Sequence, residues 1–328
     1  MTALKVLFIG GTGIISSACA ARAVAAGMEL TVLNRGKTST RPLPEGAEVV
    51  QADIRDPDSV RAALGDREFD VVVDFVAFLP EHVQADIALF QDRTGQYIFI
   101  SSASAYQTPP ARLPIVESTP LRNPHWQYSR DKIACEELLT AAYRETGFPV
   151  TIVRPSHTYD RTTVPLPGGW TTVARMRRGQ PVVVPGDGTS LWTLTHHTDF
   201  AKAFVGLLGR PQAIGDSFHI TSDEVLTWNQ IYELVAAAAG VEPRLVHIAS
   251  RTIAAHIPAL GPGLLGDKSH SMIFDNRKVK ALVPEYVATV PFATGAREII
   301  AWQDAEPGRG AVDDELNTAF DRLIAAAG

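Results

Sequence analysis

The chain has 328 residues, a formal charge of −6 at pH 7 and two cysteines. It is long enough for two hydrophobic cores, and its acidic balance argues against nucleic acid as the main partner. Two cysteines form neither a disulfide framework nor a zinc site, which favours a reducing, cytoplasmic compartment. No run approaches the roughly 20 apolar residues of a membrane span. We therefore expect a cytoplasmic globular protein, without membrane association, that has one large domain and one smaller lobe.

The predicted elements begin with an apolar strand at residues 4–9, which stops at a glycine-rich turn. The turn leads into a predicted helix whose N-terminal amides and dipole attract phosphate. Gly10 allows a tight turn and Gly13 lets a pyrophosphate approach the backbone, while Ser16 stands where a third glycine is usual. A strand, turn and helix without a ligand is the alternative. The residues predicted here to bind a dinucleotide are Gly10, Thr12, Gly13, Ile14 and Ile15.

The second and third predicted strands end beside the expected position of an adenosine. Neutral Asn34 and cationic Arg35 follow the second strand, where an acidic residue would hold both ribose hydroxyls and repel a 2′-phosphate. Asp53 is predicted to accept from an adenine amino group while Ile54 packs on the ring, although Asp53 also suits a helix N-terminus. These residues predict NADP or NAD as the cofactor, with NADP favoured, and a solvated surface arginine is the alternative.

Apolar runs and helical segments alternate through the first hundred residues. Such alternation predicts a doubly wound parallel α/β sheet of the Rossmann type with right-handed crossovers. We expect a dinucleotide-binding domain at residues 1–155, to which residues of about 195–215 return, a smaller α/β substrate lobe at 156–310, and a C-terminal helix at 311–328. The predicted strands cover residues 4–9, 29–33, 47–51, 69–76 and 97–100.

Polar residues follow the fifth predicted strand and open a long helix predicted at about 126–146. Tyr128 and Lys132 share one helix face, and Ser102 lies at the strand end, where ligands of open parallel sheets bind. The ammonium is expected to lower the pKa of the phenol towards neutral pH. We predict that Ser102 holds a substrate oxygen while Tyr128 moves its proton, and that Ser104 contacts the substrate. Serines at a strand end can also be simple turn formers.

Six motifs span nearly the whole chain. They are GGTGIIS at 10–16, SSASAY at 101–106, YSRDK at 128–132, RPSHTYD at 154–160, GDGTSLWTLTHHTDFA at 186–201 and FDNRKVK at 274–280. In this order they resemble the extended short-chain dehydrogenase/reductase family, the group usually labelled NAD-dependent epimerase/dehydratase. The resemblance implies a Rossmann domain with a small substrate lobe, hydride transfer at a nicotinamide, and Ser102, Tyr128 and Lys132 as the catalytic residues.

The resemblance also implies contacts with the cofactor and with a second subunit. In that family the lysine, here Lys132, hydrogen-bonds the nicotinamide ribose. Pro155 and His157 would line the nicotinamide end, and Ala77 would lie beside the cofactor. A homodimer through the third and fourth predicted helices is expected on the same ground.

Some residues depart from the family pattern. Nucleotide-sugar members usually carry a phosphate-clamping arginine where this chain has Trp192, which weakens the case for a nucleotide-linked substrate. Trp192 and Trp126 are predicted to stack on a sugar, a base or another flat group, with packing in the lobe as the alternative. Arg161 is predicted to contact the substrate or to be a solvated loop residue. This branch also looks similar to the chloroplast stem-loop RNA-binding proteins, although the acidic charge and the Ser-Tyr-Lys set disfavour RNA binding.

The second lobe holds further candidate features. No further side chain with suitable spacing joins His196, His197 and Asp199, so we predict no metal site. Asp199 is predicted to be the N-cap of a helix. Residues 258–270, rich in glycine and proline, are predicted to form a loop that is either a lid over the substrate or a plain connection. An apolar stripe predicts that the last helix packs on the body of the protein or on a neighbour.

These patterns favour an NAD(P)-dependent oxidoreductase or epimerase. It would interconvert an alcohol and a carbonyl on a small, hydroxylated, sugar-like substrate that can be nucleotide-linked. A non-catalytic nucleotide sensor or RNA-binding protein on the same fold is the alternative. A dehydratase is disfavoured, because related dehydratases carry an Asp-Glu pair where this chain has Ala103 and Ser104.

Overall fold

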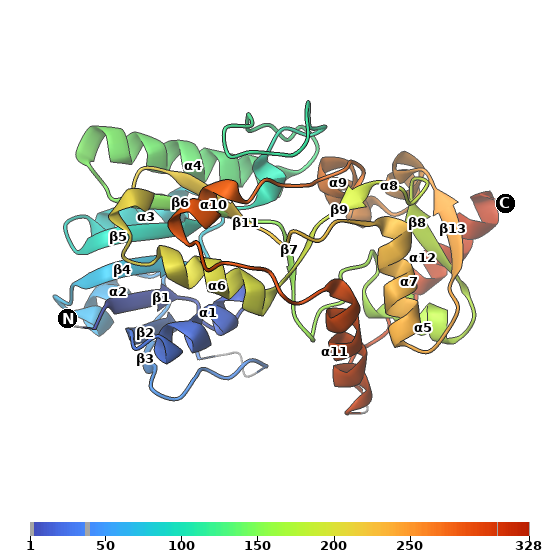
Figure 1. The fold of residues 1–328 in the computed structure, drawn as a ribbon, viewed down its shortest axis with the longest axis horizontal. Coiled ribbons are helices and arrows are strands. Elements are labelled where there is room, and N and C mark those ends of the chain that lie inside the picture. Colours follow the sequence, from blue (N-terminus) through green and yellow to red (C-terminus); the bar gives the residue numbers. More distant parts are fainter. Residues whose placement is uncertain (1–2, 37–39, 307, 328) are drawn as a thin grey trace.

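A seven-stranded sheet forms the centre of the computed structural model, which describes residues 3–36, 40–306 and 308–327 (Figure 1). All seven strands are parallel and pair in the order β11-β6-β5-β4-β1-β2-β3. The doubly wound α/β sheet predicted from the sequence is therefore confirmed. The strands are β1 (Lys5–Ile9), β2 (Glu29–Asn34), β3 (Glu48–Gln51), β4 (Phe69–Asp74), β5 (Thr94–Ile100), β6 (Val150–Pro155) and β11 (Ser217–Ile220).

Helices cover both faces of this sheet. Successive strand residues point to opposite faces, so Val6 and Phe8 of β1 belong to one buried core while Leu7 and Ile9 belong to another. Two covered faces explain why the central strands β1 and β4 contain continuous apolar runs rather than alternating with polar residues. The first face is covered by α1 (Ile14–Ala25), α6 (His197–Leu207) and α10 (Arg277–Leu282), and the second by α2 (Pro57–Leu64), α3 (Pro80–Phe90) and α4 (Gln127–Thr146).

A smaller lobe, at the right of Figure 1, is built from later parts of the chain around its own core. The chain returns from it to the main sheet through α6 and β11, so the lobe is not one continuous segment. We keep the predicted domain boundaries as a proposal. The elements of the smaller lobe include β7 (His157–Tyr159), α5 (Trp170–Arg177), β8 (Pro181–Pro185), β9 (Leu191–Trp192), β10 (Leu194–His196), β12 (Leu226–Thr227), α7 (Trp228–Ala238), β13 (Arg244–Ile248), α8 (Ser250–His256) and α11 (Phe292–Asp304).

The predicted N-cap of α6 is wrong. The cap is His196, whose side chain accepts from the Thr198 amide, and Asp199 lies inside the first helical turn. The Asp199 carboxylate instead accepts the backbone N–H groups of Thr289 and Val290, at 2.9 and 2.8 Å. An aspartate that suits a cap by composition is thus used for a tertiary contact with a distant segment.

Residues 258–268 of the segment predicted to be a loop are helical. They form the short turns η3 (Pro258–Leu260), α9 (Gly261–Gly263) and η4 (Leu264–Lys268), the last of which is π-helical. The final helix, α12 (Asp314–Ala327), buries Phe320 and Leu323 in a small core of the lobe. Its predicted packing on the body of the protein is confirmed.

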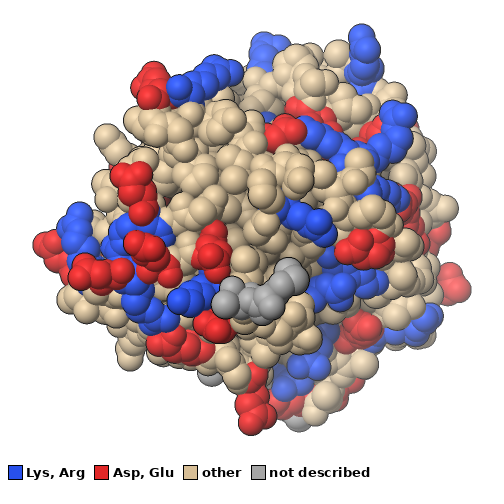
Figure 2. All heavy atoms as spheres, turned by 60° about the vertical axis from the view of Figure 1, so that its left-hand side comes forward, with Lys and Arg blue, Asp and Glu red and all other residues tan. Residues whose placement is uncertain are grey.

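The surface carries charges of both signs. Figure 2 shows one face on which lysine and arginine side chains are interspersed with aspartate and glutamate. None of the helices in the described part of the chain combines the length and the apolar character needed to cross a bilayer.

Candidate active site

The turn after β1 has a geometry that fits a phosphate group. Gly10 has a φ of +81°, in the left-handed region, and a Cβ there would lie 2.7 Å from Cγ1 of Val76. The Oγ of Ser16 accepts the N–H of Gly13 at 2.8 Å, so the residue that replaces the third glycine helps to cap α1. A glycine cradle directly before a helix N-terminus is the arrangement that binds a pyrophosphate, and the residues present therefore fit a dinucleotide.

A cleft of about 290 Å³ lies at the carboxyl ends of β1, β2 and β3, beside this turn. Predicted cofactor residues line it, namely Gly10, Thr12, Asn34, Arg35, Asp53 and Ile54. The residues at the start of α1 (Gly13, Ile14 and Ile15) are not part of its lining. Sequence reasoning missed Arg55, Phe78 and His82, which also line the cleft, although each lies close in sequence to a predicted residue.

A second hollow, of about 310 Å³, contains the phenol of Tyr128, and we name it the Tyr128 pocket. Residues predicted to act on or bind the substrate line it, as do two predicted to lie near the nicotinamide. They are Ser102, Ser104, Trp126, Tyr128, Pro155, His157 and Trp192. Arg161 is different, because it lines a separate groove together with residues of α1 and α11. The structure therefore does not bring Arg161 to the Tyr128 pocket.

A chain of hydroxyls joins the end of β5 to α4 inside the Tyr128 pocket. Ser129 donates to the Oγ of Ser104 at 2.8 Å, and the Oγ atoms of Ser104 and Ser102 lie 2.9 Å apart. Either of the last two hydroxyls can be the donor, and the Oγ of Ser102 also accepts the N–H of Ser104 at 3.2 Å. The hydroxyls of Ser102 and Ser104 thus both line the Tyr128 pocket and are held by hydrogen bonds.

Lys132 is buried, with 1% of its surface exposed. Its Nζ donates to the carbonyls of Ala77 and Ile100, at 2.6 and 2.7 Å, so Ala77 contacts the lysine and does not line the cofactor cleft. The ring of Phe78, which does line the cleft, is centred 4.7 Å from the same Nζ. Burial lowers the pKa of Lys132 to about 8.

The pKa of Tyr128 is raised, not lowered as the sequence predicted. Burial is the largest cause, hydrogen bonding with the Ser102 side chain opposes it, and the nearby carboxylate of Asp267 adds to it. The ammonium of Lys132 lies 5.8 Å from the centre of the Tyr128 ring but is directed at backbone carbonyls. The prediction failed because it counted the charge and left out the desolvation of the phenol.

One wall of the Tyr128 pocket comes from η4, which lies in the segment predicted to be a lid over the substrate or a plain connection, although sequence reasoning did not single out its charged residues. Asp267 and Lys268 line the pocket, and the Lys268 Nζ lies 3.4 Å from the Asp267 carboxylate. The two side chains are 14% and 20% exposed. Burial raises the pKa of Asp267, and the ammonium of Lys268 opposes that rise. An adjacent acid and base within a glycine-rich segment was the available signal.

The two predicted stacking tryptophans differ in their surroundings. Trp192 is 2% exposed and stacks on Trp228 with ring centres 5.3 Å apart, so it packs in the core of the lobe, as the alternative prediction had it. Its indole N–H donates to Nδ1 of His157 at 3.3 Å. Trp126 is half-buried, with its ring centre 5.1 Å from that of Tyr128. Trp126 is therefore the better placed of the two to contact a ligand.

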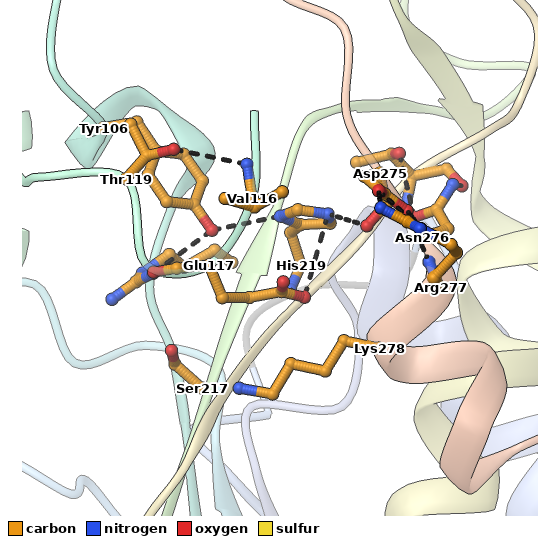
Figure 3. Close-up of polar contacts among 12 residues, drawn as sticks. Tyr106, Val116, Glu117, Thr119, Ser217, His219, Asp275, Asn276, Arg277 and Lys278 are labelled. Atoms are coloured by element: carbon orange, nitrogen blue, oxygen red, sulfur yellow. Dashed lines mark hydrogen bonds and ion pairs between the residues drawn. The ribbon is translucent and has the colours of Figure 1, made fainter. Parts of the chain in front are cut away.

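A buried polar network lies beyond the end of β5. The hydroxyl of Tyr106 hydrogen-bonds Nδ1 of His219 at 3.0 Å, and Nε2 of His219 lies 2.8 Å from the carbonyl of Asp275 (Figure 3). A carbonyl can only accept, so Nε2 carries the proton and Nδ1 accepts from the phenol. Burial lowers the pKa of His219, which favours this neutral form, although the Glu117 carboxylate lies 3.7 Å from Nε2.

An ion pair ties the same network to α4. The guanidinium of Arg154 donates to both carboxylate oxygens of Glu136, at 2.9 and 2.5 Å, and both side chains are buried. Ser101 donates to the same carboxylate. Since Ser101 directly precedes Ser102 and Glu136 lies one helical turn after Lys132, the pair fixes β5 and α4 relative to each other.

The fold agrees with the comparisons with known proteins. The chain belongs to the NAD dependent epimerase/dehydratase family, whose model matches residues 6–221. The 2'-dehydrokanamycin reductase of Streptomyces kanamyceticus is 30% identical over 246 residues, which are 72% of this chain and 67% of that protein. The chloroplast stem-loop binding protein of 41 kDa b of Arabidopsis thaliana is 28% identical over 256 residues, 74% of this chain and 65% of that protein.

A solved structure gives the same fold. The UDP-glucose 4-epimerase of Bifidobacterium longum, in complex with NAD+ and UDP, has a TM-score of 0.72 at 19% identity, covering 92% of this chain and 98% of that one. The chain spans about two thirds of the length of the two curated relatives described above. The family and the fold are thereby established, and the particular reaction and substrate are matters for proposal.

Proposed function

We propose that the protein is an NADP(H)-dependent oxidoreductase that interconverts an alcohol and a carbonyl on a hydroxylated, sugar-like small molecule. One observation carries the proposal: the hydroxyls of Ser102 and Tyr128 line one pocket, and the buried Lys132 lies next to the Tyr128 ring. Relatives named as a reductase and as epimerases support it. When bound, the nicotinamide cofactor supplies or accepts the hydride. The glycine turn with Asn34 and Arg35 is proposed to hold that cofactor.

Each of the three residues has a role that follows from its surroundings. Ser102 holds the substrate oxygen by donating its hydroxyl proton to it. Tyr128, whose half-buried phenol has a raised pKa and stays protonated, donates its proton to a carbonyl oxygen during reduction and takes it back during oxidation. The ammonium of Lys132 stabilises the phenolate that forms when the proton has left. A homodimer through α3 and α4 remains a prediction.

Incubation with NADPH and a panel of keto sugars tests this function. Net consumption of NADPH indicates a reductase, whereas substrate conversion without net change in the cofactor indicates an epimerase that retains it. A protein that binds NADPH but transfers hydride to none of these compounds contradicts the proposal. Such a result favours the non-catalytic alternative, for which the stem-loop-binding relative is the supporting observation.

The pKa of Lys132 predicts a pH dependence. Because burial lowers that pKa to about 8, the ammonium is lost as the pH rises through 8, and kcat/KM is expected to fall above that pH. The pH dependence of folding stability has the opposite sign to that of kcat/KM. An unfolded lysine still binds its proton above pH 8, so the contribution of Lys132 to stability rises with pH there. Measured pH profiles of kcat/KM and of the free energy of unfolding check both directions.

A matched control separates the lysine from its neighbouring thiol. Burial raises the pKa of Cys135 to about 12, so Cys135→Ala should keep the same alkaline limb of activity. An alkaline limb that disappears in Cys135→Ala, or a wild-type profile that stays flat above pH 8, contradicts the role proposed for Lys132.

Arg35 provides a test of the preference for NADP. It is exposed and lines the cofactor cleft, where it is proposed to pair with the 2′-phosphate. Arg35→Ala is expected to raise KM for NADPH about tenfold or more, the usual value of a charge-assisted hydrogen bond, and to leave KM for NADH unchanged. Arg61→Ala, which removes an exposed arginine of α2, is the control. Equal changes in both KM values contradict the assignment.

A further inference from the structure

The Tyr128 pocket carries no net charge. Among the described residues that line it, Lys268 is the one permanent cation, and its Nζ lies 3.4 Å from the carboxylate of Asp267. His157 also lines the pocket, and burial lowers its pKa to about 3, so that its ring is neutral at physiological pH. The single positive charge is therefore balanced by the single negative charge.

A nucleoside diphosphate is poorly matched to such a pocket. Its pyrophosphate carries more than one negative charge, and sites that take it from water offset that charge with cations, most effectively with the fork of an arginine. Lys268 already has a carboxylate as its partner. Trp192 adds no hydrogen-bond donor for a phosphate, because it is 2% exposed and its indole N–H already donates to His157.

The same groups suit a ring that carries neighbouring hydroxyls. A hydroxyl both donates and accepts, so one hydroxyl can donate to the Asp267 carboxylate while the next accepts from the Lys268 ammonium. The half-buried Trp126 offers an apolar face beside the reacting phenol, with its ring centre 5.1 Å from that of Tyr128. The Nζ of Lys268 lies 5.7 Å from the ring centres of both Trp126 and Trp192, so the ammonium stands near both indoles.

The wall that carries the pair is held in place by direct contacts. The carbonyl of Gly266 accepts from Nδ2 of Asn123 at 2.6 Å and from the hydroxyl of Thr108 at 3.2 Å. A Cβ on Gly266 would lie 2.9 Å from both the Asn123 side chain and Cβ of Trp126, so this close approach requires glycine. Asp267 and Lys268 are thus presented to the pocket by a preorganised turn.

We propose that Asp267 and Lys268 select a free polyhydroxylated ring, one that is not linked to a nucleotide, by binding two of its neighbouring hydroxyls while Trp126 covers a face of the ring. This inference rests on the proposed function, because it assigns a substrate class to the same site. It makes the pair on η4 determinants of specificity in addition to the three catalytic residues proposed above.

Two substrate panels test the inference. Hydride transfer from NADPH is measured with free keto sugars and keto cyclitols, and separately with UDP- and dTDP-linked keto sugars, with UDP added as an inhibitor. We expect turnover of free compounds that UDP does not inhibit. Preferential turnover of the nucleotide-linked sugars, or competitive inhibition by UDP, overturns the inference and leaves the proposed function intact. Transfer to neither panel by a protein that binds NADPH contradicts the proposed function, and the inference falls with it.

Variants of the pair give an independent readout. Lys268→Met and Asp267→Asn each remove a charge-assisted hydrogen bond, and we expect KM for the best free substrate to rise about tenfold or more while kcat and NADPH affinity stay close to wild type. Lys280→Met is the matched control, because Lys280 lies on α10 and pairs with Asp223. Unchanged KM in both pocket variants overturns the inference, provided that their melting temperatures match the wild type. A loss confined to kcat also overturns it, since the pair would then act on Tyr128 rather than on substrate binding.

Discussion

Replacing Tyr128 by phenylalanine is expected to lower kcat by about 10²–10⁴-fold, the usual contribution of a general acid or base. The change removes one hydroxyl and keeps the ring that packs beside Trp126. Without that hydroxyl no proton reaches the carbonyl oxygen held by Ser102, whereas the cofactor cleft is lined by other residues. NADPH affinity, measured by fluorescence titration, should therefore be unchanged.

Tyr143→Phe is the matched control for this experiment. Tyr143 lies on the same helix, α4, and is 39% exposed, so its hydroxyl has no part in the proposed chemistry. We expect wild-type kcat for Tyr143→Phe and an intact melting temperature for both variants. Wild-type turnover by Tyr128→Phe contradicts the proposed role of the phenol, and a loss of NADPH binding indicates a structural role in its place.

Replacing Glu136 by leucine is expected to reduce the free energy of unfolding by about 3–5 kcal/mol, the usual cost of leaving one partner of a buried ion pair alone. Glu136 and Arg154 are 3% and 5% exposed, so the guanidinium that remains is largely shielded from water. Ser101 loses its acceptor in the same variant. Urea denaturation measures the change.

Two further variants identify the cause of that loss. Glu137→Leu, at an exposed neighbouring position of α4, should have little effect on stability. The double variant Glu136→Leu/Arg154→Met should recover much of the lost stability, because it removes the uncompensated charge together with its partner. A double variant that is less stable than Glu136→Leu alone would mean that packing, rather than charge, sets the cost.

The sheet could be predicted because each strand leaves a pattern in a short stretch of sequence and this pattern recurs along the chain. A parallel strand that is covered on both faces reads as an apolar run, as in β1 and β4, and a helix follows each of these two strands. The same regularity brings Ser102 and Tyr128 together, because the end of a strand and the helix that follows it meet at the ligand-binding edge. Their roles stay predictions until the variants are measured.

The wall formed by η4 could not be predicted in the same way. Asp267 and Lys268 reach the Tyr128 pocket through tertiary contacts of Gly266 with Asn123 and Thr108, which lie far away in the sequence. Neither periodicity nor spacing reports such a contact. The pKa of Tyr128 was misjudged for a related reason, since the desolvation that raises it depends on the folded surroundings of the ring.

The position of η4 in the chain also affects how function can be inferred from sequence similarity. The family model ends at residue 221, and the turn that bears Asp267 and Lys268 belongs to the last third of the chain. On the roles proposed above, the residues of hydride transfer and the charged pair that selects the substrate lie in separate stretches, and the family match covers only the first of them. Transplanting residues 258–276 between two relatives is accordingly a route to exchange their selectivity while the shared reaction machinery stays as it is.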